Sequence, residues 1–212
     1  MNDALECVAA VGILPVIAVP SREVAVPLAR ALVDGGIAAI EVTLRNDCAL
    51  DAIRAIRAAF PDMAIGAGTI LSESQIAPAR EAGADFLVAP GLDVDLLKAA
   101  LAAGVDIVPG VTNPTEITAA VRLGLKTLKF FPAEISGGVP ALTLYHGPFQ
   151  DVKFVPTGGM TMDNIGAYLA KPFVSACGGS YMAKSSDIKA GQFDLIRENS
   201  KRCVAIAREA RT

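Results

Sequence analysis

Two textures alternate along this chain of 212 residues. Short runs rich in β-branched residues end in Gly, Pro or Thr, and each is followed by an alanine-rich stretch whose apolar residues recur at helical spacing. The pattern predicts eight strands, at residues 14–19, 38–44, 64–67, 86–89, 106–109, 127–131, 153–156 and 174–177. It predicts helices at residues 23–34, 48–60, 74–82, 94–102, 114–123, 140–145, 163–169 and 193–208.

This alternation predicts the fold class. Strands that alternate with helices form right-handed βαβ units around a parallel sheet. Eight such units close into a (β/α)8 or TIM barrel, an α/β fold, and no linker divides residues 1–212, so we expect a single domain. A doubly wound open sheet is the competing fold. No Gly-x-Gly-x-x-Gly motif follows the first strand and polar residues recur at many strand ends, and both observations favour the barrel.

Glycine follows several of the predicted helices. Gly35, Gly83, Gly104 and Gly124 stand where a left-handed residue commonly ends a helix. We therefore expect each of these four helices to stop at its glycine.

Composition and charge narrow the function classes. Hydrophobic residues make up 52% of the chain and the mean hydropathy is +0.46, which is high for a monomer and suggests a buried subunit interface. The 19 basic and 22 acidic residues give a net charge of -3, and no basic run predicts a nucleic-acid or membrane surface. The apolar runs are too short to span a bilayer.

The cysteine and histidine residues argue against disulfides, a catalytic triad and a metal site. The cysteines lie far apart, without a Cys-x-x-Cys pair: Cys7, Cys48, Cys177 and Cys203. The first six residues lack the basic segment of a signal peptide, so we expect reduced thiols in a cytoplasmic protein. His146 is the only histidine, which argues against a Ser-His-Asp triad or a His-rich metal site. We expect no metal and no cofactor.

The second predicted strand carries three polar residues on one face. Glu41, Thr43 and Arg45 alternate with apolar Val42 and Leu44. A carboxylate that points into a barrel costs free energy unless it has a partner or a function. One interpretation is a structural Glu41–Arg45 ion pair. The other is a proton-transfer group beside an arginine that binds an anion.

A lysine interrupts the apolar sixth strand. Lysine is rarely buried without a reason, and burial disfavours its charged form. The neutral amine is the form that attacks carbonyl groups, so Lys129 is a candidate nucleophile. The alternative is a lysine whose stem covers apolar surface while its head reaches solvent. Because helices cover the outside of barrel strands, an outward lysine would fit poorly.

Glycine-rich turns follow the predicted strands. The third strand ends in Gly66-Ala67-Gly68-Thr69, where Thr69 offers a hydroxyl group. The last two strands end in Thr157-Gly158-Gly159 and in Gly178-Gly179-Ser180. A TIM barrel builds its phosphate site from backbone N–H groups after these last two strands. Two glycine pairs there predict a phosphorylated substrate.

These motifs together resemble a known family. They occur in the order EVTLR (41–45), GAGT (66–69), PG (90–91), PG (109–110), KFFPAE (129–134) and PTGG (156–159). The chain is similar, from Pro15 to Ser180, to the 2-keto-3-deoxy-6-phosphogluconate (KDPG) aldolases, which also act as 4-hydroxy-2-oxoglutarate (KHG) aldolases. The resemblance implies a metal-free Schiff-base aldolase, usually a homotrimer, with pyruvate and a phosphorylated keto acid as its small-molecule partners.

The resemblance also implies a role for each matching residue. Lys129 matches the Schiff-base lysine and Glu41 the general acid/base. Arg45 and Thr69 match the residues that hold the pyruvyl carboxylate, and Thr157 matches a threonine linked to stereocontrol. The matching phosphate cradle comprises Gly158, Gly159, Gly179 and Ser180.

Two positions depart from the family pattern, and two other functions stay open. Many members place a basic residue just after the first strand, where it can reach the phosphate. This chain reads Val19-Pro20-Ser21-Arg22 there, which leaves open whether Arg22 reaches the phosphate. Many members also have a Trp after Gly-Gly-Ser, where this chain has Tyr181. A phosphate-binding barrel isomerase would use the same glycine turns without a buried lysine. A non-catalytic sugar-phosphate-binding protein would need the cradle alone.

Overall fold

The computed structural model describes residues 3–212; Met1 and Asn2, the start of the segment read for a signal peptide, lie outside the described residues. The strands are short and parallel: β1 (Ile13–Ile17), β2 (Ala39–Thr43), β3 (Ala64–Gly68), β4 (Phe86–Val88), β5 (Asp106–Val108), β6 (Gly110–Val111), β7 (Thr127–Phe130), β8 (Lys153–Pro156) and β9 (Cys177–Gly179). The helices are α1 (Asp3–Val11), α2 (Arg22–Asp34), α3 (Ala49–Ala59), α4 (Ile76–Ala82), α5 (Val94–Ala102), α6 (Pro114–Arg122), α7 (Gly138–His146), α8 (Ile165–Leu169), α9 (Ser185–Lys189) and α10 (Phe193–Ala210).

The strands form a curled parallel sheet. Six strands pair in the order β5-β4-β3-β2-β1-β9, and three pair in the order β6-β7-β8. The register sets Glu41 opposite both Val16 of β1 and Gly66 of β3. Lys129 lies opposite Gly110 of β6 and Val155 of β8. The α/β class with a parallel sheet is therefore confirmed.

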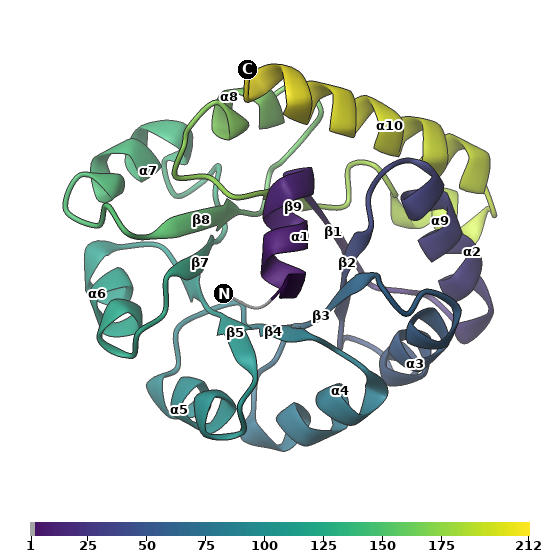
Figure 1. The fold of residues 1–212 in the computed structure, drawn as a ribbon, viewed down its shortest axis with the longest axis horizontal. Coiled ribbons are helices and arrows are strands. Elements are labelled where there is room, and N and C mark those ends of the chain that lie inside the picture. Colours follow the sequence, from purple (N-terminus) through teal and green to yellow (C-terminus); the bar gives the residue numbers. More distant parts are fainter. Residues whose placement is uncertain (1–2) are drawn as a thin grey trace.

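Helices and strands form separate layers. Figure 1 shows the strands around the centre of the molecule with the helices outside them, and α1 drawn across the centre. One buried cluster lies between the helices and the strands. A second, smaller cluster joins α1 to residues on the other face of the strands, including Leu14, Phe86 and Val155. The curled sheet therefore has an interior face, which α1 partly covers.

The observed elements correct several sequence expectations. Helices α1 and α9 had no counterpart among the expected elements, and the helix expected at residues 74–82 begins as a 3₁₀ turn, Glu73–Gln75. The last strand is β9 (Cys177–Gly179) rather than residues 174–177, because Val174 forms only an isolated bridge with Phe154. Gly35 has φ -83°, so the left-handed stop expected there is wrong, and Gly36 takes that conformation with φ +89°.

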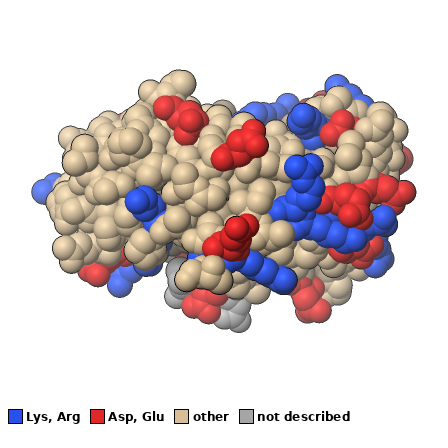
Figure 2. Space-filling model, turned by 90° about the horizontal axis from the view of Figure 1, so that it is seen from above, with Lys and Arg blue, Asp and Glu red and all other residues tan. Residues whose placement is uncertain are grey.

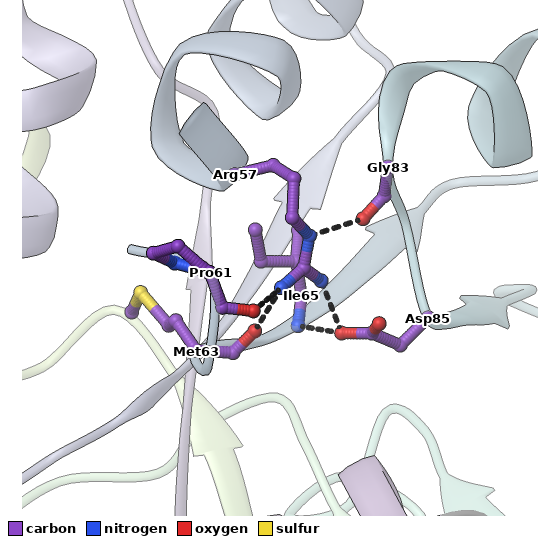
Figure 3. Close-up of polar contacts among 6 residues, drawn as sticks. All are labelled: Arg57, Pro61, Met63, Ile65, Gly83 and Asp85. Atoms are coloured by element: carbon purple, nitrogen blue, oxygen red, sulfur yellow. Dashed lines mark hydrogen bonds and ion pairs between the residues drawn. The ribbon is translucent and has the colours of Figure 1, made fainter. Parts of the chain in front are cut away.

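An arginine fixes the turn between α3 and β3 (Figure 3). Arg57 donates hydrogen bonds to the carbonyl oxygens of Gly83 at 3.0 Å and Met63 at 3.0 Å, and a third to that of Pro61. Its ion pair with Asp85 is 2.5 Å long, and the Asp85 carboxylate also accepts the Ile65 N–H at 2.8 Å. One side chain thus joins α3 to the starts of β3 and β4.

The surface in Figure 2 mixes charges of both signs. Lys and Arg lie among Asp and Glu on one side of this face, and the other side is largely uncharged. On α10 the charges pair within the helix, as in Arg197–Asp194 at 3.0 Å and Lys201–Glu198 at 2.9 Å. No helix within residues 3–212 has the length and apolarity needed to cross a membrane.

Candidate active site

A buried ion pair lies on the interior face of the curled sheet. Lys129 of β7 and Glu41 of β2 are far apart in sequence, yet Lys129 Nζ lies 3.3 Å from Glu41 Oε1. Lys129 is 5% exposed and Glu41 1% exposed. Glu41 Oε2 is buried and has no hydrogen-bond partner within residues 3–212. An amine and a carboxylate in contact, with one carboxylate oxygen left over, can exchange a proton and still bind a further group.

The geometry contradicts two of the structural alternatives. Glu41 pairs with Lys129 and not with Arg45, so the Glu41–Arg45 ion pair expected as one interpretation does not form. The Lys129 head is buried and lies 5.3 Å from the ring centroid of Phe131, so this lysine does not extend into solvent.

Arg45 and Thr69 meet beyond the ends of β2 and β3. The Arg45 Nε donates a 3.0 Å hydrogen bond to the Thr69 hydroxyl oxygen. Thr69 has φ +61°, a left-handed conformation that is costly for a β-branched residue. Such conformations persist where the surroundings hold them, often at functional sites. An exposed guanidinium beside a hydroxyl group has the donors that an anion such as a carboxylate requires.

The two glycine turns lie on neighbouring strands. Thr157 directly follows β8, is 5% exposed and bridges to Gly178 of β9. Gly158 and Gly159 both have positive φ angles, +95° and +82°, which a residue with a side chain would adopt only with strain. Gly179 ends β9 and Ser180 follows it, exposed. Arg22 is exposed at the first residue of α2.

The structure adds a contact that sequence reasoning missed. The buried Tyr168 hydroxyl of α8 donates a short hydrogen bond to the Glu134 carboxylate. Burial raises the pKa of Tyr168, and the bond to Glu134 raises it further. The Glu134 N–H also donates to the Gly158 carbonyl at 3.2 Å. Glu134 stands in the KFFPAE motif, but only the fold shows that it supports the glycine turn.

Two glycines leave room for the polar side chains. A methyl group on Gly68 would lie 2.2 Å from Glu41 Oε1, and one on Gly178 would lie 2.3 Å from the Thr157 hydroxyl oxygen. Either methyl group would force the neighbouring Glu41 or Thr157 side chain to move. The Glu41 and Thr157 side chains therefore occupy space that is free only because positions 68 and 178 are glycine.

Within residues 3–212, no three His, Cys, Asp or Glu side chains are grouped to hold a metal ion. The Lys129–Glu41 pair, the Arg45–Thr69 contact and the glycine turns are formed by the motifs on which the sequence resemblance rested. The family model for KDPG and KHG aldolases matches residues 5–199. The chain belongs to this family. The resemblance drawn from the sequence motifs is therefore confirmed.

Similar members of the family are named aldolases. The KHG/KDPG aldolase of Escherichia coli is 45% identical over 192 residues, 91% of this chain and 90% of that protein. The 2-dehydro-3-deoxy-phosphogluconate aldolase of Treponema pallidum is 42% identical over 97% of this chain and 98% of that one.

One solved structure carries direct chemical information. The KDPG aldolase of Legionella pneumophila is 38% identical to this chain, with a TM-score of 0.90, and the match covers 96% of this chain and 97% of that one. In that structure pyruvate was captured as a covalent carbinolamine intermediate. The Zymomonas mobilis KDPG aldolase, with 3-phosphoglycerate, has a TM-score of 0.85 and 40% identity over 94% of this chain and 96% of that one.

Proposed function

We propose that this chain is a Schiff-base aldolase, an aldehyde-lyase that cleaves KDPG to pyruvate and glyceraldehyde 3-phosphate and also cleaves KHG. The observation that carries the proposal is the buried lysine in contact with a buried carboxylate, Lys129 with Glu41 at 3.3 Å. An amine held away from water beside a proton acceptor has what Schiff-base formation requires.

Lys129 begins the reaction at the C2 ketone of the substrate. Glu41 accepts a proton from the Lys129 ammonium, and the free amine adds to C2 to give a carbinolamine. Glu41 returns a proton to the C2 hydroxyl, which leaves as water while the C=N bond forms. The protonated Schiff base then attracts electrons toward C2. Covalent catalysis replaces one difficult carbanion step with several easier steps.

Cleavage follows from this electron sink. Glu41 takes the proton of the C4 hydroxyl, the C3–C4 bond breaks, and its electron pair forms an enamine on C2–C3. Glyceraldehyde 3-phosphate leaves as the aldehyde. C3 then takes a proton, and water hydrolyses the Schiff base to release pyruvate and restore Lys129. A positioned acid–base group typically contributes about 100- to 10,000-fold to such a rate.

The remaining residues orient the substrate. Arg45 and Thr69 hold the carboxylate, which KDPG and KHG share. Thr157 is assigned to C4, the stereocentre that cleavage removes and that the reverse condensation forms. Backbone N–H groups of Gly158, Gly159 and Gly179, with Ser180, bind the phosphate. Arg22 is the cationic residue closest in sequence to the carboxyl end of β1. Binding the phosphate away from the reacting carbons positions C2 near Lys129.

The test is trapping with pyruvate and borohydride. One reduced pyruvyl group should be added per chain, and peptide mapping should place it on Lys129. A barrel isomerase or a non-catalytic sugar-phosphate-binding protein would take up no pyruvyl group, and label on another residue would overturn the mechanism. Exposed Lys98 of α5 serves as the internal control, because it should stay unlabelled.

The architecture and assembly extend this proposal. We infer that the two sheets close into one eight-stranded barrel. Where the sheets meet, the Lys129 N–H donates to the Pro109 carbonyl at 2.9 Å and the Ser175 N–H donates to the Phe154 carbonyl at 2.9 Å.

We further infer a homotrimer, because the apolar side chains of Ile135 and Leu144 are 87% and 75% exposed. A cytoplasmic location is supported by the four free cysteines.

A further inference from the structure

A cavity lies at the end of the curled sheet opposite the glycine turns. It has a volume of about 540 Å³ and reaches Thr127 and Lys153, the first residues of β7 and β8. Helix α1, which packs against β1, β2 and β3, forms one wall through Leu5, Val8 and Ala9. A volume of roughly 300–1,000 Å³ is the usual size of a small-molecule site.

The cavity wall is mostly apolar. Leu14, Val88, Val108 and Val155 project into it from four strands, and Phe86 lies across Gly66, where a Cβ atom would be 2.4 Å from the Phe86 ring. Apolar cavities hold apolar ligands more readily than water. The wall therefore favours a hydrocarbon occupant over a chain of water molecules.

The mouth of the cavity is basic. Lys153 and Arg211 are exposed there and Lys171 is half-buried. Lys153 Nζ donates to the Pro172 carbonyl at 2.9 Å, and Arg211 donates to the carbonyls of Ala9 and Ser175. None of the three cations forms an ion pair with a carboxylate in the part of the chain that the structure describes. A cluster of unpaired cations attracts an anion.

We propose that this cavity binds a medium-chain carboxylate, with the hydrocarbon tail against the apolar wall and the carboxylate at Lys171 and Lys153. A few charged groups at the mouth of an apolar pocket select this class of ligand, because the tail gains by leaving water while the anion stays at the rim.

The cavity also reaches the proposed active site from behind. Glu41 and Lys129 line its inner end, although the substrate-binding loops lie at the other end of the strands. A tail in the cavity would contact these two side chains and restrict their movement. The carboxylate should therefore act as an inhibitor that slows Schiff-base formation without occupying the groups that bind the substrate's carboxylate and phosphate.

Calorimetry with decanoate tests binding. We expect one decanoate bound per chain. Methyl decanoate, which lacks the charge, should bind at least roughly tenfold more weakly, a loss of about 1.4 kcal/mol in binding free energy. Enzyme whose Lys129 has first been reduced with pyruvate should still bind decanoate. Loss of binding in that enzyme would place decanoate in the substrate site and overturn the proposal. The binding measurement requires no turnover, so its result is independent of whether the aldolase activity is found.

Variants locate the site. Leu5→Trp should fill the cavity and abolish binding, while Glu6→Trp, on an exposed position of the same helix, should not. Lys171→Gln should weaken binding about tenfold, and the exposed Lys98→Gln should leave it unchanged. Equal binding of decanoate to all four variants would refute the proposed site. So would the absence of binding to the parent protein.

Discussion

The Glu41 carboxylate lies where a carboxylate would ordinarily be avoided. It is 1% exposed, and only one of its two oxygens has a partner within residues 3–212. Contact with Lys129 offsets part of the cost of burying either charge, and removing one partner would leave the other buried and unpaired. Such an arrangement stabilises the fold little, and its retention at this cost is understandable if the pair is used in catalysis.

The first prediction concerns the proton carried by Glu41. Glu41→Gln keeps the shape of the side chain and removes its titrating group. We expect kcat for KDPG cleavage to fall by about 100- to 10,000-fold with little change in KM, measured by steady-state assay. The exposed Glu73→Gln is the control and should retain normal turnover. Near-normal turnover in Glu41→Gln would reduce Glu41 to a structural partner of Lys129.

The second prediction concerns the cysteines. Burial raises the pKa of Cys203 to about 12 and raises that of Cys177 as well, so both thiols stay protonated and unreactive at neutral pH. Cys7 is exposed and Cys48 half-buried. A thiol reagent at pH 7 should therefore modify Cys7 first and Cys48 more slowly, as read by mass spectrometry. Early modification of Cys203 in folded protein would contradict this order, whereas in urea all four should react.

At the scale of elements, single side chains join helices to strands. Arg57 joins α3 to the strands through hydrogen bonds to three carbonyl oxygens and an ion pair with Asp85. The side chains of Arg57 and Asp85 are 25% and 31% exposed. Arg54, on the same helix, makes an exposed i,i+3 pair with Asp51 and no other ion pair within residues 3–212. Similar residues on one helix thus have different structural consequences.

The third prediction follows from this contrast. Arg57→Ala removes the donor to three carbonyls and one of the donors to the Asp85 carboxylate, so we expect it to lower the free energy of unfolding by about 2–4 kcal/mol. Arg54→Ala should cost less than about 1 kcal/mol because exposed ion pairs contribute little. Urea unfolding followed by circular dichroism measures both. Equal losses in the two variants would show that the Arg57 contacts add nothing beyond a surface pair.

The fourth prediction concerns the glycine turns. A Cβ on Gly159 would lie 2.5 Å from Glu134 Cγ, and one on Gly179 would lie 2.8 Å from the Tyr181 ring. Gly159→Val or Gly179→Val should lower kcat/KM for KDPG far more than for unphosphorylated KHG, by roughly tenfold per 1.4 kcal/mol of lost contact. Arg45→Ala should harm both substrates alike.

The control for strain is Gly104→Val. Gly104 also has a positive φ, +69°, but a Cβ there meets no atom within 4 Å. It should lower stability without changing the preference between substrates. Pyruvate trapping on Lys129 must first show that each variant is intact, and equal losses on both substrates would assign the turns to the fold.

The sequence predicted the repeating elements and failed at their edges for physical reasons. β-Branched runs and helical spacing located the strands that carry Glu41 and Lys129, because local periodicity is a property of each segment. Helix α1 was missed, because its apolar residues are buried only by packing against the interior face of the sheet, and that face exists only in the folded protein. The partners of Glu41 and Glu134 were also beyond reach, because each contact joins distant segments whose geometry only folding supplies.

At the scale of the whole molecule, the exposed apolar residues are the least explained feature. Ile135 precedes α7 and Leu144 lies on it, and both are largely exposed. Part of the face in Figure 2 is also largely uncharged. Large exposed apolar side chains commonly mark subunit contacts. The single domain expected over residues 1–212 stays a prediction, as does the trimer.

The fifth prediction concerns assembly. Sedimentation equilibrium should give about three times the 21.9 kDa chain mass. The double variant Ile135→Asp/Leu144→Asp should lower that mass, because charges are costly in a buried apolar interface. Lys98→Asp, a charge change on another helix, should leave it unchanged. A parent protein that sediments as a monomer at micromolar concentration contradicts the trimer.

The space left by Gly68 and Gly178 has a genetic consequence. Every missense change of one base in a glycine codon introduces a residue with a Cβ atom, and alanine is the smallest of these. Even that methyl group would lie 2.2 Å from Glu41 Oε1 at position 68 and 2.3 Å from the Thr157 hydroxyl oxygen at position 178. Only third-base changes are silent there, so two codons without any side-chain chemistry should tolerate mutation as poorly as the codon of Lys129.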